Sequence, residues 1–298
     1  MIFGAHMSTS GGFRKAMERG ASIRCGVVQI FVKNNMQWLG RMPAEAEVEA
    51  FMAERERGGF NTVFGHTGYL INLGGPDSPN RSKSIESLTR EIWLAEALGL
   101  PFLVLHPGAH LGAGEERGLE RIVAGLDEVL AATKKAKVRI ALENTAGQGS
   151  CLGYKIEHLA AIFDAVKSPG RLGVCLDTAH AFAAGFDLRV AEGWETLIGR
   201  VESLLGVEQI LAFHLNDSKT GLGSRVDRHE HIGRGQIGLE GFRHIVNDAR
   251  FAEAPGCLET PKSEDMREDV ENLATLRSLL KKSQGKQRKA KALPARRK

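Results

Sequence analysis

One stretch of the chain, Gln209–Gly233, concentrates residue types that bind metal ions. It opens on a short apolar run that ends at Phe213, and His214 follows directly, where a buried strand would pass into a loop. Asp227 and His229 are two residues apart, so in an extended segment their side chains point to the same side. An imidazole and a carboxylate that converge in this way can hold a divalent cation. A polar loop with surface histidines is the simpler alternative.

The same arrangement recurs along the chain, because a His, Asp or Glu follows nearly every apolar run. The residues that follow seven of the runs are His6, His66, His106, Glu143, Asp177, His214 and Glu259. His180 lies three residues after Asp177, and a helical turn would place both side chains on one side. Closely spaced carboxylates repel one another unless protons or cations compensate them. We therefore predict a cluster of metal ligands at one place in the fold.

Eight apolar runs alternate with helical segments, and this alternation predicts a (β/α)₈ TIM barrel in a single domain. The predicted strands are Ile2–Ala5, Val27–Phe31, Thr62–Gly65, Phe102–Leu105, Val138–Leu142, Leu172–Leu176, Ile210–Phe213 and Gly256–Leu258. The predicted helices are Ser10–Gly20, Ala44–Arg57, Ser82–Leu98, Glu115–Ala136, Glu157–Val166, Ala191–Leu205, Leu239–Ala249 and Glu264–Lys281. In such a barrel the C-terminal ends of the strands meet at one mouth, which would bring the ligand types together. A doubly wound open sheet is the structural alternative.

The composition is that of an ordinary globular protein, with 42% hydrophobic and 26% charged residues in a chain of 298. No apolar run approaches the roughly 20 residues of a membrane span, and the N-terminus does not read as a secretory signal. The four cysteines form no CxxC pair, which favours reduced thiols in a cytoplasmic protein.

Charge divides the chain into two parts. Nine of the 40 Lys and Arg residues lie in residues 281–298, which have no Asp or Glu; residues 1–280 keep 31 basic against 36 acidic side chains, a net charge of −5. We predict that residues 1–280 form the barrel domain and that residues 281–298 are a basic, disordered tail. This tail could be a nucleic-acid-binding arm or only a solubilising end.

The candidate ligands are too numerous for one tetrahedral zinc ion, which takes four. The candidates are His66, His106, Glu143, Asp177, His180, His214, Asp227, His229 and Glu259. Such a set suits two or three ions that share a carboxylate, and clusters of this kind hold the attacking and leaving oxygens in phosphoryl transfer.

The motifs around these residues resemble those of the endonuclease IV family of apurinic/apyrimidinic endonucleases. The matching segments are GAHMSTSGG, QIFVKNNMQW, GHTGYLINLG, LHPGAH, ALENTAGQG, CLDTAHAFAAGFD, FHLNDSKTGLGSRVDRHEHIGRGQIG and LETP. They occur in the family's order over residues 4–261. The resemblance implies a zinc-dependent DNA-repair enzyme that cleaves duplex DNA on the 5′ side of an abasic site. The products would be a 3′-hydroxyl and a 5′-deoxyribose phosphate, and the enzyme would also trim blocked 3′ ends.

The resemblance also implies a ligand set for three Zn²⁺ ions, with Mn²⁺ possible at one or more sites. The first ion would be held by His66, His106 and Glu143. The second would share Glu143 and be held also by Asp177, His214 and Glu259. The third would be held by His180, Asp227 and His229. Glu143 would stand beside the water that attacks phosphorus.

Three further residues match positions that contact DNA in the family. Tyr69 and Leu70 match residues that enter the base stack at the damage, a use of aromatic and apolar side chains known from DNA-bending proteins. Met36 stands where the family pattern KNxRQW has an arginine, so the charge of a guanidinium is lost there. Lesion discrimination is therefore harder to infer from the sequence than cleavage is.

Two other functions fit parts of the pattern. Sugar isomerases and epimerases of the xylose isomerase-like barrels resemble this chain at a smaller set, Glu143, Asp177, His214 and Glu259, around one metal. They do not need the other five candidates, above all Asp227 and His229. A non-catalytic DNA-binding or zinc-storing protein would not need an open metal cluster. We expect a monomer that acts on DNA and not at a membrane.

Overall fold

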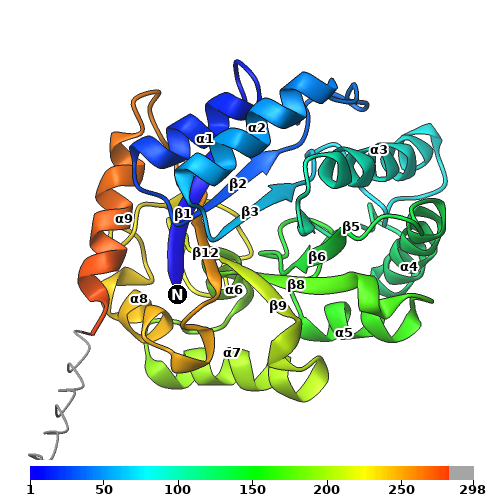
Figure 1. The fold of residues 1–298 in the computed structure, drawn as a ribbon. Helices are drawn as coiled ribbons and strands as arrows, with labels where there is room; N and C mark the ends of the chain where they lie inside the picture. Colours follow the sequence, from blue (N-terminus) through cyan, green and yellow to red (C-terminus); the bar gives the residue numbers. More distant parts are fainter. Residues whose placement is uncertain (282–298) are drawn as a thin grey trace, which may run out of the picture.

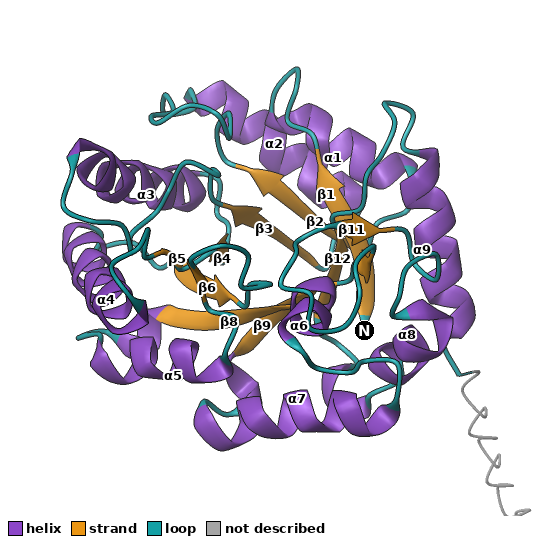
Figure 2. Ribbon diagram, turned by 180° about the vertical axis from the view of Figure 1, so that it is seen from behind, coloured by secondary structure: helices purple, strands orange, loops and turns teal. Residues whose placement is uncertain are grey.

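The structure is a computed structural model that describes residues 1–281 of the chain. Eight parallel strands close into a barrel in the order β1-β12-β9-β8-β6-β4-β3-β2, and the views in Figures 1 and 2 both place them inside a ring of helices. The barrel strands are β1 (Ile2–Met7), β2 (Val27–Phe31), β3 (Thr62–His66), β4 (Phe102–Leu105), β6 (Arg139–Glu143), β8 (Leu172–Asp177), β9 (Ile210–His214) and β12 (Pro255–Leu258). The predicted TIM barrel is confirmed.

Helices connect successive strands and, apart from the short α6 over the barrel mouth, cover the outside of the barrel. They are α1 (Phe13–Ser22), α2 (Glu45–Gly58), α3 (Pro79–Ala97), α4 (Glu115–Ala132), α5 (Ile156–Ala165), α6 (Thr178–Ala184), α7 (Ala191–Leu204), α8 (Gly238–Val246) and α9 (Arg267–Leu279). Two small antiparallel pairs lie outside the barrel sheet, and they are formed by β5 (Gly108–Ala109) with β7 (Cys151–Leu152) and by β10 (Asp217–Ser218) with β11 (His229–Glu230). No helix within residues 1–281 is long and apolar enough to cross a membrane.

The predicted elements are present, but several of their ends differ. Helix α1 begins at Phe13 and not at Ser10, because Gly11 and Gly12 have φ angles of 82° and 103°, which an α-helix cannot accommodate. Helix α4 ends four residues earlier than predicted, and the Thr133 hydroxyl donates to the carbonyl of Val129 at its end. The predicted boundary between residues 280 and 281 stays a prediction, since residues 282–298 lie outside the described part.

Local chemistry explains where the helices nearest the barrel mouth begin. Ser78 caps α3, since its side chain accepts the N–H of Arg81, and Pro79 occupies the first turn. Asp177 caps the short helix α6, where its Oδ1 accepts the N–H of His180 at 2.7 Å. Gly185 ends α6 with a φ of 117°. A predicted metal ligand therefore also begins the helix that carries a second one.

Candidate metal centre

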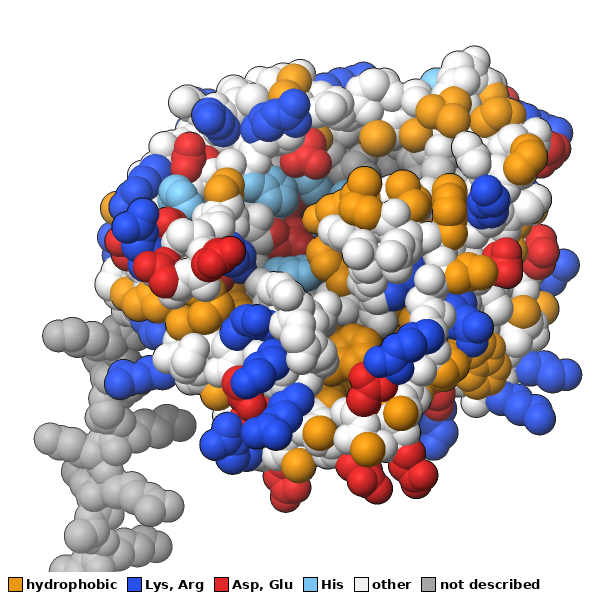
Figure 3. Space-filling model, turned by 90° about the horizontal axis from the view of Figure 1, so that it is seen from above, with side chains coloured by type: hydrophobic (Ala, Val, Ile, Leu, Met, Phe, Trp, Pro, Cys, Tyr) orange, Lys and Arg blue, Asp and Glu red, His pale blue; other side chains and the backbone are white. Residues whose placement is uncertain are grey.

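Strand alternation explains how the barrel delivers metal-ligand types to its mouth. Successive side chains of a strand point to opposite faces, so residues two apart share the barrel interior. Six strands each supply at least one residue to a single buried apolar cluster inside the barrel. In each case a predicted ligand stands two positions after one of these residues. These pairs are Phe64 and His66, Val104 and His106, Ala141 and Glu143, Cys175 and Asp177, Ala212 and His214, and Cys257 and Glu259. The apolar layer thus forms the floor, and Figure 3 shows His and acidic side chains in a hollow above it.

The first group of side chains comes from β3, from the end of β4 and from β6. His66 Nε2 and His106 Nε2 lie 3.3 and 3.0 Å from the same oxygen, Glu143 Oε2. Glu143 is fully buried, whereas the His106 side chain is 39% exposed. Three possible ligand atoms of these residues lie within 4.8 Å of one another, so one ion could contact all three.

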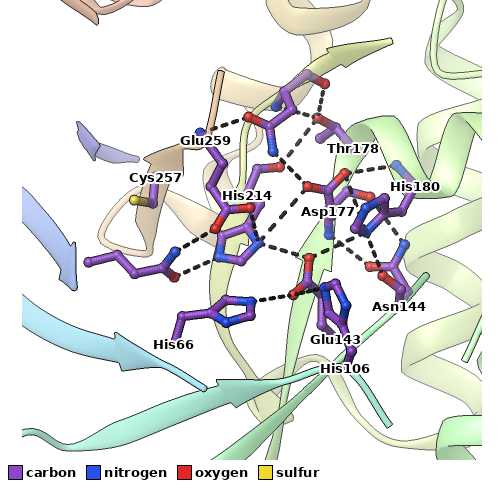
Figure 4. Close-up of polar contacts among 12 residues, drawn as sticks. His66, His106, Glu143, Asn144, Asp177, Thr178, His180, His214, Cys257 and Glu259 are labelled. Carbon is purple, nitrogen blue, oxygen red and sulfur yellow. Dashed lines mark hydrogen bonds and ion pairs between the residues drawn. The ribbon is translucent and has the colours of Figure 1, made fainter. Parts of the chain in front are cut away.

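The second group shares Glu143 and is centred on His214 (Figure 4). His214 Nδ1 lies 2.9 Å from Glu143 Oε1 and 3.0 Å from Glu259 Oε2. Asp177 Oδ2 is 3.9 Å from the same ring nitrogen. Because the two oxygens of Glu143 face different groups, this carboxylate lies where a bridging ligand would be needed.

The third group comes from α6, β11 and the loop before β11. The Nε2 atoms of His180 and His229 face each other at 3.4 Å. Asp227 Oδ2 lies 3.2 Å from His180 Nε2, and its Oδ1 lies 3.4 Å from His229 Nε2. Asp177 also borders this group, since its Oδ2 is 3.6 Å from His229 Nε2. The structure therefore brings all nine predicted ligands into one continuous cluster.

Hydrogen bonds orient two of the histidines so that the Nε2 atom of each ring faces the cluster. His66 Nδ1 lies 2.8 Å from the carbonyl oxygen of Thr67, and His180 Nδ1 lies 2.9 Å from that of Asn144. A carbonyl oxygen can only accept, so these Nδ1 atoms carry protons, and the Nε2 atoms point into the cluster, where a metal ion can displace a proton. Such outer partners are typical of histidines that bind metals, and the donor set of imidazoles and carboxylates fits a divalent cation.

Opposite charges balance one another in the cluster. Burial raises the pKa of Glu143, but the His214 and His106 imidazoles outweigh this effect and hold the pKa well below its ordinary value. Burial lowers the pKa of His180, but Asp177 and Asp227 raise it well above its ordinary value. The pKa of Asp227 is lowered to about 2, because His180 outweighs its burial. Glu143 and Asp227 are thus ionised at neutral pH, and a metal ion would replace the protons of the imidazoles.

Three buried amide side chains support the cluster, and the sequence prediction missed them. Gln29 Oε1 accepts from His214 Nε2 at 2.7 Å, and its amide nitrogen donates to Glu259 Oε1 at 2.5 Å. Asn216 donates to Asp177 Oδ2 at 2.7 Å and accepts the N–H of Glu259. Asn144 accepts the N–H of Asp177 at 2.7 Å. A glutamine inside the apolar run VVQIF was the one available signal.

His6 follows the first strand run but is not part of the three groups. Its Nδ1 accepts from Gln29 at 2.8 Å and lies 3.8 Å from Glu259 Oε1. It lines a cleft of about 590 Å³ beside the cluster together with Lys262 and the Ser8–Ser10 segment. His6 therefore contacts the ligand cluster through Gln29, which also bonds to His214 and Glu259.

The three predicted DNA contacts lie on two loops beside the cluster. Tyr69 is 62% exposed, and its ring packs edge-on against Phe31 and His66 at centroid distances of 5.3 and 6.3 Å. Leu70 is partly buried, and Met36 is 67% exposed. A second cleft, of about 280 Å³, runs from Tyr69 to the ligand cluster. The structure thus exposes apolar surface at the edge of the hollow, next to the predicted metal ligands.

Comparisons with known proteins agree with this arrangement. The family of xylose isomerase-like TIM barrels matches residues 14–279. The protein named "Probable endonuclease 4" from Chloroflexus aurantiacus is 49% identical over 278 residues, which are 93% of this chain and 98% of that protein. The protein of the same name from Geobacter sulfurreducens is 46% identical over 285 residues, or 96% of each chain.

Solved structures that resemble this chain fall into two groups, one similar in sequence and fold and the other similar in fold alone. Endonuclease IV from Thermus thermophilus is 35% identical and superposes with a TM-score of 0.82, over 94% of this chain and 98% of that one. A D-tagatose 3-epimerase-like protein has a TM-score of 0.70 at 19% identity, over 94% and 97% of the two chains, and this likeness concerns the fold alone. The chain belongs to the endonuclease IV family of xylose isomerase-like TIM barrels and carries a metal-binding cluster at its mouth.

Proposed function

We propose that this protein is a DNA-repair endonuclease that cuts duplex DNA on the 5′ side of abasic sites. It would leave a 3′-hydroxyl and a 5′-deoxyribose phosphate and would also remove blocked 3′ ends. The observation that carries the proposal is the third group, in which Asp227, His180 and His229 meet within 3.4 Å of one another. A single-metal sugar isomerase has no use for this group. The relatives named "Probable endonuclease 4" support the same activity.

The chemistry of the donor set supports three divalent cations, Zn²⁺ first and Mn²⁺ as an alternative. Imidazole and carboxylate ligands without thiolates suit both ions. We assign the ions as the family pattern implies, with Glu143 shared between the first two groups. When bound, they would supply an activated water and stabilise negative charge on the phosphate oxygens. Three such ions against four carboxylates leave the cluster at about +2, which attracts a DNA phosphate although the body is acidic.

The chain's own residues would position the reacting groups. Glu143 contacts both of the first two groups, and its low pKa keeps it ionised, so it accepts hydrogen bonds and can orient the attacking water. Asn216 fixes Asp177 and Glu259 relative to each other. Tyr69, Leu70 and Met36 would enter the duplex from the two loops at the edge. A backbone kinked at the lesion would then present one phosphate to the cluster.

The cysteines and the composition of the ligand cluster bear on where the enzyme works and on its oligomeric state. All four cysteines are free, and Cys25, Cys175 and Cys257 are buried, which suits the reducing cytoplasm. The ligand cluster is complete within one chain, so we propose that a monomer is sufficient for activity.

Incision of a duplex with one tetrahydrofuran abasic analogue tests the proposal directly. We expect a single cut 5′ to the analogue, loss of cutting after treatment with a strong chelator, and recovery when Zn²⁺ or Mn²⁺ is returned. The same duplex without the analogue is the control substrate. A metal-loaded protein that leaves the abasic strand intact but isomerises a sugar would refute the proposal in favour of the isomerase alternative.

A further inference from the structure

A buried ion pair lies beside the metal centre and takes no part in it. Lys33 follows β2, and Glu91 lies on α3; Lys33 Nζ and Glu91 Oε1 are 3.0 Å apart. The two side chains are only 3% and 0% exposed, and no other Lys or Arg ion pair within residues 1–281 is buried so completely on both sides. Burying two charges costs free energy of desolvation, so such a pair is poor evidence of a stabilising role. The hydrogen bonds of this pair indicate a role in positioning two loops.

Lys33 closes the loop that follows β2. Its Nζ donates to the carbonyl oxygen of Gln37 at 2.6 Å and lies 3.4 Å from that of Asn34. The Met36 backbone N–H donates to the Asn34 side chain at 2.9 Å. The loop is therefore wrapped around one ammonium group, while the Met36 side chain at its tip remains exposed.

Glu91 joins this loop to the one that follows β3. Its Oε2 accepts the N–H of Gly68 at 3.0 Å, directly before Tyr69. The Ser87 hydroxyl lies 2.5 Å from the carbonyl oxygen of Trp38 and 3.2 Å from Glu91 Oε1. One helix thus holds both loops through groups that are buried and hydrogen-bonded.

The two loops touch where Gly68 lies. A Cβ at this position would be 2.5 Å from Lys33 Nζ and 3.2 Å from the Asn35 carbonyl oxygen, closer than side chains normally approach. Glycine allows the backbone of one loop to reach the ammonium group that organises the other. The tips that carry Met36 and Tyr69 are consequently fixed relative to each other.

We propose that Lys33 and Glu91 are positioning residues that hold the two loops in one arrangement before DNA is bound. This inference rests on the proposed function, because it takes Met36, Tyr69 and Leu70 as the residues that enter the duplex. Apolar side chains on a rigid backbone lose less conformational entropy on binding than those on a mobile loop. The pair would thus act on recognition of the abasic gap, and the metal centre on cleavage.

Two variants separate this role from simple stability. In Glu91→Gln the shape is kept, but Lys33 loses its counter-charge. In the double variant Lys33→Met/Glu91→Leu, apolar groups of similar size replace the pair, so the fold can recover its stability while the bonds to Gln37 and Gly68 are absent. The control is Asp248→Asn. Asp248 Oδ2 lies 2.6 Å from Arg250 Nη2, and this pair precedes β12, at the end of the strand that faces away from the barrel mouth.

The measurements are KM and the single-turnover rate constant for an abasic-analogue duplex, zinc content, and hydrogen exchange of the free protein. In the folded double variant we expect KM to rise about tenfold, while the rate constant at saturating enzyme changes less than about threefold. Backbone amides of residues 34–38 and 68–70 should exchange faster, and zinc content should match that of the wild type. Asp248→Asn should leave KM and loop exchange unchanged.

Each contrary result overturns a distinct step. Unchanged exchange in both loops of the double variant would refute the tether. Faster exchange with a wild-type KM would refute its role in recognition. If the wild-type protein does not cut abasic duplex, the proposed function fails, while the exchange comparison still decides whether the pair fixes the loops.

Discussion

At the scale of single residues, the shared carboxylate of Glu143 is the most connected group of the metal centre. One of its oxygens faces His66 and His106, and the other faces His214 and His180. Removing it would withdraw a ligand from two groups at once. The surrounding imidazoles would also lose the negative charge that balances them, so metal affinity and cleavage are coupled at this residue.

Glu143→Ala is therefore expected to reduce incision of abasic duplex by on the order of 10³-fold or more, as loss of a central electrostatic group does in other enzymes. Zinc content should fall in parallel, because two groups lose a ligand. Metal analysis and an incision assay on the same preparation check this. The matched control is Glu157→Ala, which removes an exposed glutamate paired with Arg200 on the barrel exterior. Normal turnover with full metal content in Glu143→Ala would mean that the site lies elsewhere.

Asp248 gives a prediction for pH dependence away from the metal centre. Burial opposes ionisation of Asp248, but its hydrogen bonds from Arg250 and Trp194 lower its pKa below the ordinary 3.8. A depressed pKa in the folded state stabilises the fold above the ordinary pKa, and this contribution is lost as the pH falls through the folded value. Asp248→Asn should cost about 1 kcal/mol at pH 7.

The difference between Asp248→Asn and the wild type should shrink as the pH falls below about 4. Urea unfolding of both proteins at pH 7, 4 and 3 measures it. A difference that is the same at all three pH values would show that the charge of Asp248 is not the cause.

The candidate metal ligands could be predicted from the sequence, but the side chains that support them could not. His66, Glu143 and Asp177 could be found because metal-ligand types stand out at the ends of apolar runs. Gln29 and Asn216 are amides and do not belong to the His, Asp and Glu pattern. Their supporting role depends on hydrogen bonds to His214 and Asp177, about 185 and 39 residues away in the chain. Such long-range pairings follow from barrel closure, which local sequence patterns do not contain.

At the scale of elements, the loops after the strands differ greatly in how they are held. The loop after β9 is anchored by the buried carboxylate of Asp217, which accepts five backbone N–H groups. The donors are Ser218, Gly233, Gly235, Ile237 and Gly238. These bonds hold the segment after His229 against β10. The sequence did not indicate this anchor, because two-residue strands such as β10 and β11 are too short for a periodic pattern.

The loop after β3 carries the prediction for lesion recognition. Tyr69→Ala should weaken the preference for abasic over intact duplex by about tenfold, since stacking of one aromatic ring on a base contributes about 1–3 kcal/mol. Partial desolvation beside the cluster and the nearby Glu259 and Glu143 carboxylates raise the pKa of Tyr69 to about 12, so the hydroxyl stays neutral at working pH and the ring can enter the base stack uncharged.

Binding isotherms for the two duplexes and single-turnover cleavage at saturating enzyme separate recognition from chemistry. Met52→Ala is the control, because Met52 is a 43% exposed apolar residue on the outer helix α2. If cleavage in Tyr69→Ala falls as far as in Glu143→Ala, the loop takes part in the chemistry and the division of roles is wrong.

At the scale of the whole molecule, charge is distributed against expectation for a DNA enzyme. Residues 1–280 have a net charge of −5, and nine Lys and Arg residues follow without an acidic partner. Residues 282–298 lie outside the described part of the structure, so the role of this tail is argued from the sequence alone. All nine predicted ligands precede it, the last being Glu259. The basic tail can therefore be removed without removing any predicted metal ligand.

We predict that the tail supplies DNA affinity that does not depend on sequence and contributes almost nothing to catalysis. Each phosphate that it neutralises would release counterions and steepen the salt dependence by roughly 0.9 in the log–log slope. Because an arm rarely engages every charge at once, truncation after Leu280 should change the slope by about 3 to 6. Turnover at saturating DNA should hardly change.

A full-length variant with Gln at the nine basic positions controls for chain length, and binding of intact and abasic duplexes over a salt series is the measurement. Slopes that superimpose for all three proteins would leave the tail as a solubilising end.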